Sequence, residues 1–181
     1  MGIRKVVTVF CASKAPSGSP LARQAYRLGA ALARAGFTVC NGGYGGAMAE
    51  SARGAKAVGG ATIGVTMDHW GRVGNRWIDR RVHTRTLTER LMRLLELSDG
   101  YAVLPGGSGT LLELAAVWEY QNKKLHSPKP IVLVDNFWLP LVRAARKAFR
   151  IQGQGSAAAL VTVARTPESC ARLLRRVIGR V

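Results

Sequence analysis

The chain has 181 residues, of which 48% are hydrophobic and 20% are charged, and this balance excludes a disordered or fibrous protein. No apolar run approaches the roughly eighteen residues of a membrane span, and the short run VVTVF near the N-terminus is too brief for a signal peptide. The net charge of +17 favours anionic partners, either a phosphorylated small molecule or a nucleic acid.

Three cysteines are spread along the chain, at Cys11, Cys40 and Cys170. Their odd number and the absence of a CxxC pair argue against a disulfide framework or a zinc site. We therefore expect a cytoplasmic protein without a metal. Cys11 and Cys40 lie near the ends of predicted strands, where a small buried side chain is the default interpretation.

Predicted strands and helices alternate along the whole chain. In chain order they are a strand at 5–13, a helix at 19–36, a strand at 37–43, a helix at 46–60, a strand at 61–67, a helix at 86–99, a strand at 100–107, a helix at 109–125, a strand at 129–135, a helix at 137–150, a strand at 158–164 and a helix at 167–180. The segment 68–85 is predicted as a polar connection, and 153–159 as a flexible loop.

The strands are unbroken runs rich in Val and Ile, which is typical of a parallel sheet that is covered on both faces. The sequence therefore predicts an α/β fold. We expect residues 1–181 to form one Rossmann-like, doubly wound domain with about six or seven parallel strands and helices on both faces.

Basic residues are densest at 72–90, 143–150 and 172–180. The last two stretches fall on predicted amphipathic helices, where a solvated polar face explains them. The charges are spread along the chain and do not form one block, so nucleic acid is disfavoured as a partner. The first stretch lies in the polar segment near the predicted site, where its arginines could cover a charged ligand or face solvent or a dimer partner.

Two glycine-rich turns follow strands that the sequence predicts to be neighbours: NGGYGG at 41–46 and PGGSGT at 105–110. Glycines allow backbone N–H groups to approach an anion closely, and a helix that begins after the turn adds the positive end of its dipole. Thr110 could cap the second helix and offer a hydroxyl. A pair of such turns predicts a nucleotide-like ligand, although each could also be a plain strand-to-helix turn.

Neither turn matches the better-known phosphate fingerprints. PGGSGT is not GxxxxGK[ST], which argues against a P-loop NTPase, and CASKAPSGSP after the first strand is not GxGxxG. Asn41 ends the second strand where a dinucleotide oxidoreductase would have an acidic residue.

Glu113 stands one turn into the helix that follows the second glycine turn, among apolar neighbours. A carboxylate there could hold a sugar hydroxyl, activate water or stabilise an oxocarbenium charge. The alternative is a surface glutamate favoured by the helix dipole. Because a lone buried carboxylate is costly, we expect an arginine as its partner.

The stretch Pro105-Gly106-Gly107-Ser108-Gly109-Thr110-Leu111-Leu112-Glu113 resembles the PGGxGTxxE hallmark of the Lonely guy (LOG) family. Asn41 to Met48 resemble the family's second-strand turn, and Cys11-Ala12-Ser13 its first-strand end. The family's catalytic arginine stands nine residues before an Asp that opens a strand, and counting back from Asp99 gives Arg90. The similarity runs from about residue 5 to residue 135.

The resemblance implies a cytoplasmic homodimer that needs no cofactor and acts on a small-molecule nucleotide. The reaction it implies is hydrolysis of the N-glycosidic bond of a nucleoside 5′-monophosphate, either AMP or a cytokinin riboside monophosphate, to free base and ribose 5-phosphate. It assigns catalysis to Glu113 and Arg90. Phosphate or nucleotide binding falls to the remaining site residues, namely Gly106, Gly107, Ser108, Gly109, Thr110, Gly42, Gly43, Gly45, Gly46, Met48 and Ser13.

The chain departs from the family pattern at Leu91 and Leu112, where Lys and Glu are usual. A second hypothesis is therefore a non-catalytic carrier for a phosphorylated ligand, such as a nucleotide or the molybdenum cofactor. Trp118 is predicted to pack in the core or at a dimer interface. The name "lysine decarboxylase", often given to such proteins, is rejected because no lysine here has the setting of a PLP Schiff base.

Overall fold

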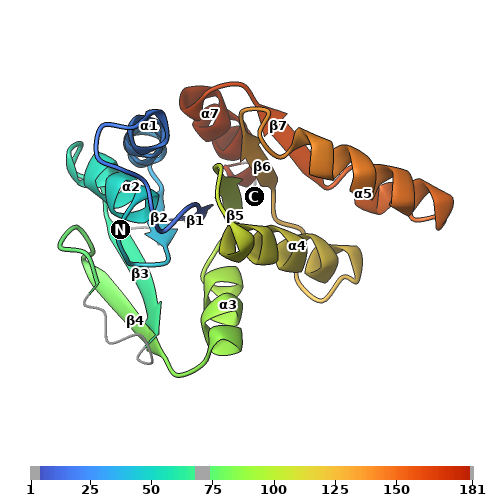
Figure 1. The fold of residues 1–181 in the computed structure, drawn as a ribbon, viewed down its shortest axis with the longest axis horizontal. Helices are drawn as coiled ribbons and strands as arrows, with labels where there is room; N and C mark the ends of the chain where they lie inside the picture. Colours follow the sequence, from blue (N-terminus) through green and yellow to red (C-terminus); the bar gives the residue numbers. More distant parts are fainter. Residues whose placement is uncertain (1–4, 68–73, 180–181) are drawn as a thin grey trace.

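The computed structural model describes residues 5–67 and 74–179, and these contain one parallel sheet of seven strands (Figure 1). Across the sheet the strands are β4 (Arg80–Thr84), β3 (Thr62–Met67), β2 (Thr38–Asn41), β1 (Val6–Phe10), β5 (Gly100–Val103), β6 (Ile131–Val134) and β7 (Val161–Ala164). Every neighbouring pair is parallel. The predicted α/β fold is thus confirmed.

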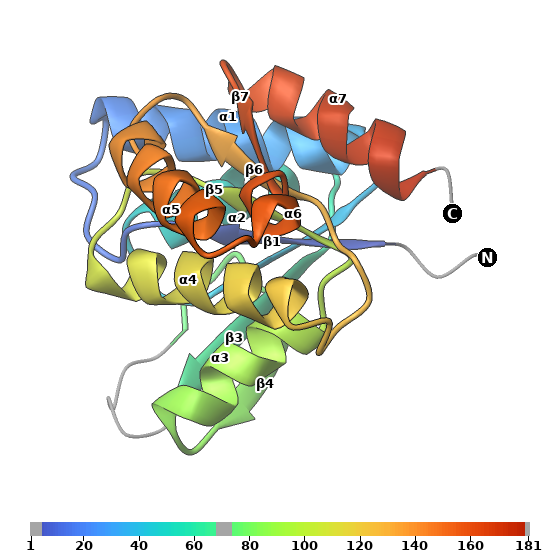
Figure 2. The ribbon, with the colours of Figure 1, turned by 90° about the vertical axis from the view of Figure 1, so that its right-hand side faces the viewer.

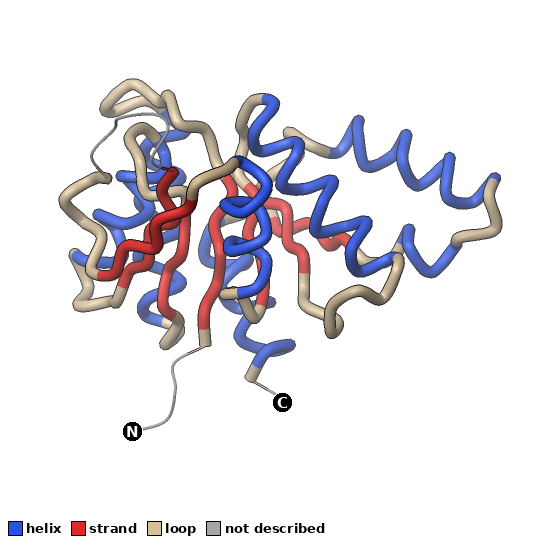
Figure 3. The backbone as a smooth tube through the Cα atoms, turned by 90° about the horizontal axis from the view of Figure 1, so that it is seen from below, coloured by secondary structure: helices blue, strands red, loops and turns tan. Residues whose placement is uncertain are grey.

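Helices cover both faces of this sheet, as Figures 2 and 3 show. On one face lie α1 (Pro20–Arg34), α2 (Ala47–Lys56) and α7 (Pro167–Ile178). On the other lie α3 (Leu87–Glu96), α4 (Ser108–Asn122), α5 (Leu139–Ile151) and the short α6 (Gly155–Ala158). Each face has its own hydrophobic core, because alternate residues of β1 point to opposite sides: Val7 and Val9 join the first cluster and Phe10 the second.

Two elements were missed by the sequence reasoning. β4 lies inside the segment predicted as a polar connection. It stands at the edge of the described sheet, paired with β3, and its residues RRVHT are mostly exposed, so it lacks the apolar run of a central strand. α6 is a single helical turn within 153–159, which was predicted to be a flexible loop. Residues 68–73 of the predicted connection, with His69, Trp70 and Arg72, lie outside the described residues.

The sequence predicted Trp118 either in the core or at a dimer interface, and the structure places it in the core. It is 4% exposed, its indole Nε1 donates to Ala157 O at 2.8 Å, and its ring meets the edge of Phe149. The three cysteines are also buried and unpaired. Over the described part of the chain, no helix combines the length and apolar character needed to cross a membrane.

Candidate active site

The order of the strands creates a break in the winding of the sheet between β1 and β5. From β1 the chain moves outward through β2, β3 and β4, and it then returns to place β5 on the other side of β1. In doubly wound sheets the loops at such a point diverge and leave a crevice at the carboxyl ends of the strands. β2 and β5, predicted to be neighbours, are therefore separated by β1, which corrects the sequence interpretation.

A cavity of about 570 Å³ occupies this crevice. It is lined by the first residues of the loop that follows β1 (the β1 loop), by Tyr44 in the turn before α2, by the start of α4, and by side chains from α2 and α3. The lining residues are Cys11, Ala12, Ser13, Lys14, Tyr44, Met48, Arg90, Gly107, Ser108, Gly109, Thr110 and Glu113.

The structure brings most of the predicted site residues to this cavity. Glu113, Arg90, Ser13 and Met48 line it, together with 107–110. The predicted residues Gly106, Gly42, Gly43, Gly45 and Gly46 are not among the lining residues. Sequence reasoning assigned no ligand role to Cys11, Ala12, Lys14 or Tyr44, which also line the cavity. The available signals were the position of Cys11 and Ala12 in the last part of a predicted strand, and of Lys14 and Tyr44 directly after predicted strands.

The start of α4 faces the cavity without a side-chain cap. The N-cap is Gly107, which makes no capping hydrogen bond, so the predicted capping role of Thr110 is wrong. Thr110 instead packs beneath Gly106, where an added Cβ would lie 2.1 Å from Thr110 Oγ1. The first N–H groups of a helix have no intrahelical partner, and the helix dipole adds positive charge there. The N-terminus of α4 is thus suited to an anion.

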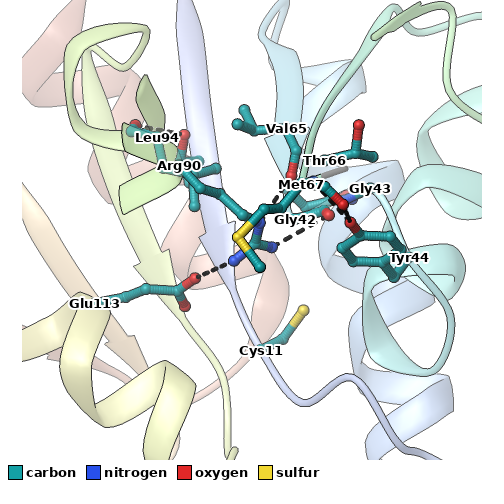
Figure 4. A network of polar contacts seen from close by, with 12 residues as sticks. Cys11, Gly42, Gly43, Tyr44, Val65, Thr66, Met67, Arg90, Leu94 and Glu113 are labelled. Atoms are coloured by element: carbon teal, nitrogen blue, oxygen red, sulfur yellow. Dashed lines mark hydrogen bonds and ion pairs between the residues drawn. The ribbon is translucent and has the colours of Figure 1, made fainter. Parts of the chain in front are cut away.

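Arg90 and Glu113 form a buried ion pair across the cavity, as Figure 4 shows. Arg90 Nη1 lies 3.8 Å from Glu113 Oε1, and the two residues are 6% and 8% exposed. The guanidinium is also held by the main chain, because Nε donates to Val65 O at 2.9 Å and Nη2 donates to Gly42 O at 3.1 Å. These contacts fix the orientation of the cation beside the carboxylate.

Burial raises the pKa of Glu113 from its ordinary value of 4.5 to about 7, and the nearby Arg90 limits the rise. Both protonation states of this carboxyl are therefore populated near neutral pH. A carboxyl with a pKa near the working pH can accept or donate a proton efficiently. Burial also raises the pKa of the Cys11 thiol far above its ordinary value, so Cys11 lines the cavity as a neutral thiol.

The glycines of the NGGYGG turn make room for neighbouring parts of the protein. A Cβ on Gly42 would lie 2.0 Å from Arg90 Nη2, so this glycine admits the guanidinium. Gly46 has a φ of +61°, and a Cβ there would lie 2.5 Å from Ser13 O. Their described contacts are with Arg90 and the β1 loop, and ligand contact by these glycines stays a prediction.

Tyr44 ties this turn to the end of β3. Its hydroxyl donates to Met67 O at 2.9 Å and accepts from Met67 N at 2.7 Å. Its ring lies 5.7 Å from the guanidinium carbon of Arg90, within the range of a cation–π contact (Figure 4). Tyr44 therefore contributes both to the cavity wall and to the surroundings of Arg90.

The arginines of the polar segment lie elsewhere. Among the described residues, Arg76, Arg80, Arg81 and Arg85 are absent from the cavity lining, and Arg72 falls in the undescribed part. No group of three His, Cys, Asp or Glu within 5–67 and 74–179 is gathered closely enough to hold a metal ion.

A doubly wound parallel sheet with a cavity at its switch point defines a Rossmann-like α/β protein. More narrowly, residues 4–169 match the model of the SLOG cluster4 family, and the chain belongs to that family.

Relatives by sequence carry an enzymatic name. A protein from Mycobacterium tuberculosis named cytokinin riboside 5′-monophosphate phosphoribohydrolase is 39% identical over 132 residues, which cover 71% of this chain and 70% of that protein. One with the same name from Mycobacterium marinum is 37% identical over 135 residues, covering 73% and 71%.

Similar solved structures carry a different name. The molybdenum cofactor binding protein from Rippkaea orientalis superimposes with a TM-score of 0.75 at 24% identity, covering 98% of this chain and 99% of that one. The molybdenum cofactor carrier protein from Chlamydomonas reinhardtii gives a TM-score of 0.71 at 22% identity, with the same coverage. At this level of identity the likeness establishes the shared fold.

Proposed function

We propose that this protein hydrolyses the N-glycosidic bond of a nucleoside 5′-monophosphate, AMP or a cytokinin riboside monophosphate, to a free base and ribose 5-phosphate. The observation that carries the proposal is the buried Arg90–Glu113 pair, which shares one cavity with the uncapped N-terminus of α4. The names of the relatives from the two Mycobacterium species support the same reaction.

The proposed placement of the substrate follows from charge. The 5′-phosphate lies at the start of α4, where Gly107, Ser108 and Gly109 line the cavity and the helix dipole favours an anion. The ribose then extends towards Glu113, one turn further along the helix. The base occupies the remaining volume near Tyr44 and Met48, which supply apolar surface.

Glu113 acts on the reacting bond in this account. As the C1′–N bond breaks, positive charge develops on the sugar, and the ionised carboxylate stabilises it and takes a proton from the attacking water. The water oxygen becomes the hydroxyl on C1′, and the proton is passed on to the departing base, which restores the carboxylate. Arg90 favours the ionised form of Glu113 and holds it in place through its fixed guanidinium. No metal or redox group enters the proposed reaction.

Replacement of Glu113 by Gln tests this mechanism. Glu113→Gln keeps the shape of the side chain and removes its charge, so we expect release of base from AMP to fall by roughly 10²–10³-fold. Glu119→Gln is the matched control, because Glu119 is exposed on the same helix and forms its ion pair with the exposed Lys123. Chromatography of the free base measures both.

Each outcome of that assay has a definite meaning. Unchanged turnover in Glu113→Gln would contradict the assigned role of the carboxylate. If the wild type releases no base but AMP still raises its melting temperature, the protein binds AMP without hydrolysing it. The carrier of phosphorylated ligands would then be the supported function.

We also propose that the protein is a cytoplasmic homodimer. Leu87 on α3 and Leu111 and Leu112 on α4 are 47%, 36% and 43% exposed. Large apolar side chains that are exposed to solvent favour burial against a second copy. The buried, unpaired cysteines fit a reducing compartment.

A further inference from the structure

One cation in the cavity wall has no role in the arrangement described so far. Lys14 follows the end of β1, lines the cavity and is exposed. Within the described part of the chain it makes no hydrogen bond or ion pair. The other cation of the lining, Arg90, is committed to Val65 O, Gly42 O and the Glu113 carboxylate.

The backbone of Lys14 is held at the rim of the cavity by the start of α2. Ala47 N donates to Ala12 O at 3.1 Å, which ties the segment to the helix. Gly46 lets the two segments approach, since a Cβ at this position would lie 2.5 Å from Ser13 O and 2.8 Å from Lys14 N. The attachment point of Lys14 is therefore fixed, while its side chain keeps the freedom to reach a ligand.

Without this lysine, the positive charge in the cavity is smaller than the negative charge of a phosphate monoester. A phosphate monoester carries about −1.5 to −2 charges at pH 7, and a helix N-terminus supplies roughly half a positive charge. The charge of Arg90 is already offset by Glu113 when that carboxyl is ionised. A dianion at α4 would also repel the Glu113 carboxylate, and a full positive charge beside the phosphate reduces that repulsion.

We propose that the ammonium group of Lys14, which shares the cavity with the N-terminus of α4, binds the 5′-phosphate, and that it makes the site select nucleoside monophosphates over the unphosphorylated nucleosides. The proposal rests on the proposed function for the identity of the ligand. It adds a specificity-determining residue that the glycine-turn motif does not contain.

The test compares the binding of AMP and adenosine by titration calorimetry. In the wild type, the ratio of the two affinities measures the contribution of the phosphate. We expect Lys14→Met to weaken AMP binding by about ten- to a hundredfold, the range for a hydrogen bond to a charged group, and to change adenosine binding by less than about twofold. Lys14→Arg should restore most of the preference for AMP.

The control is Lys147→Met, which removes the same charge from an exposed position on α5 and should leave both affinities unchanged. Equal effects of Lys14→Met on AMP and adenosine, or no effect on either, would overturn the proposal. So would a wild type that binds AMP no better than adenosine.

Adenine release, measured on the same samples, separates the two proposals. A wild type that binds AMP through Lys14 but releases no adenine would leave the role of Lys14 standing and remove the hydrolase. If the wild type releases adenine and Lys14→Met keeps the same preference for AMP over adenosine, the hydrolase stands and the role of Lys14 is removed.

Discussion

At the scale of single residues, the sequence locates the buried ion pair of Arg90 and Glu113 but not the contacts that hold it. The PGGxGTxxE pattern singles out Glu113, and the cost of a lone buried carboxylate predicts an arginine partner, which the structure supplies in Arg90. The bonds from Arg90 to Val65 O and Gly42 O could not be predicted, because main-chain carbonyls leave no mark on the sequence. Tyr44 and Lys14 escaped notice for a similar reason, since folding alone brings them to the cavity wall.

The raised pKa of Glu113 predicts a measurable effect of pH on stability. The folded protein binds this proton more tightly than the unfolded chain does, since the pKa is about 7 when folded and 4.5 ordinarily. The stabilisation is complete below the unfolded pKa and is lost as pH rises through about 7. The free energy of unfolding of the wild type, relative to Glu113→Gln, should therefore fall by up to about 3 kcal/mol between pH 4.5 and pH 8.

Urea unfolding of both proteins across this pH range measures the difference. The Glu119→Gln variant serves as the control and should follow the wild type. Parallel curves for the wild type and Glu113→Gln would show that the carboxyl has no raised pKa in the folded protein.

At the scale of elements, the NGGYGG turn leads into α2 and packs closely against Arg90 and the β1 loop. Gly46 and Gly18 both have positive φ, at +61° and +71°. A Cβ added at Gly46 would collide with the backbone of Ser13 and Lys14, whereas a Cβ added at Gly18 would have no atom within 4 Å. We expect Gly18→Ala to cost about 1–2 kcal/mol from backbone strain alone. Gly46→Ala should cost more and should also weaken AMP binding, because the β1 loop must move. Equal losses of stability in urea unfolding would contradict this assignment.

Most elements could be predicted because their signals are local. Central strands are continuous apolar runs and α1 carries its Ser19 cap, whose Oγ accepts from Ala22 N at 3.2 Å. β4 could not be recognised, because an edge strand with a mostly exposed sequence has no such run. The order of strands was also beyond local reasoning: β1 lies between β2 and β5, and only long-range packing decides this.

At the scale of the whole molecule, part of the charge of +17 lies on the solvated faces that the amphipathic patterns predicted, although Arg146 of α5 is half-buried and donates to Ala158 O and Val161 O. Arg143, Lys147 and Arg150 on α5 and Arg172, Arg175 and Arg176 on α7 are all exposed, as predicted for solvated faces. These helices are away from the cavity lining, so the excess charge acts on an anionic substrate only through the general field of the protein.

The proposed dimer predicts a mass in solution of twice 19.4 kDa. Light scattering should give this mass for the wild type, and Leu111→Glu, which places a charge on the exposed apolar surface of α4, should shift it towards the monomer. A monomeric wild type at micromolar concentration would contradict the proposed dimer. It would leave the proposed function of the cavity unaffected.

The central claim concerns which bond is broken. The most direct measurement is mass spectrometry of the products formed from AMP by the wild type in phosphate-free buffer. The account predicts adenine and ribose 5-phosphate in equal amounts, because water attacks C1′ and the phosphate stays on the sugar. Unchanged AMP, or adenosine with free phosphate, would contradict it.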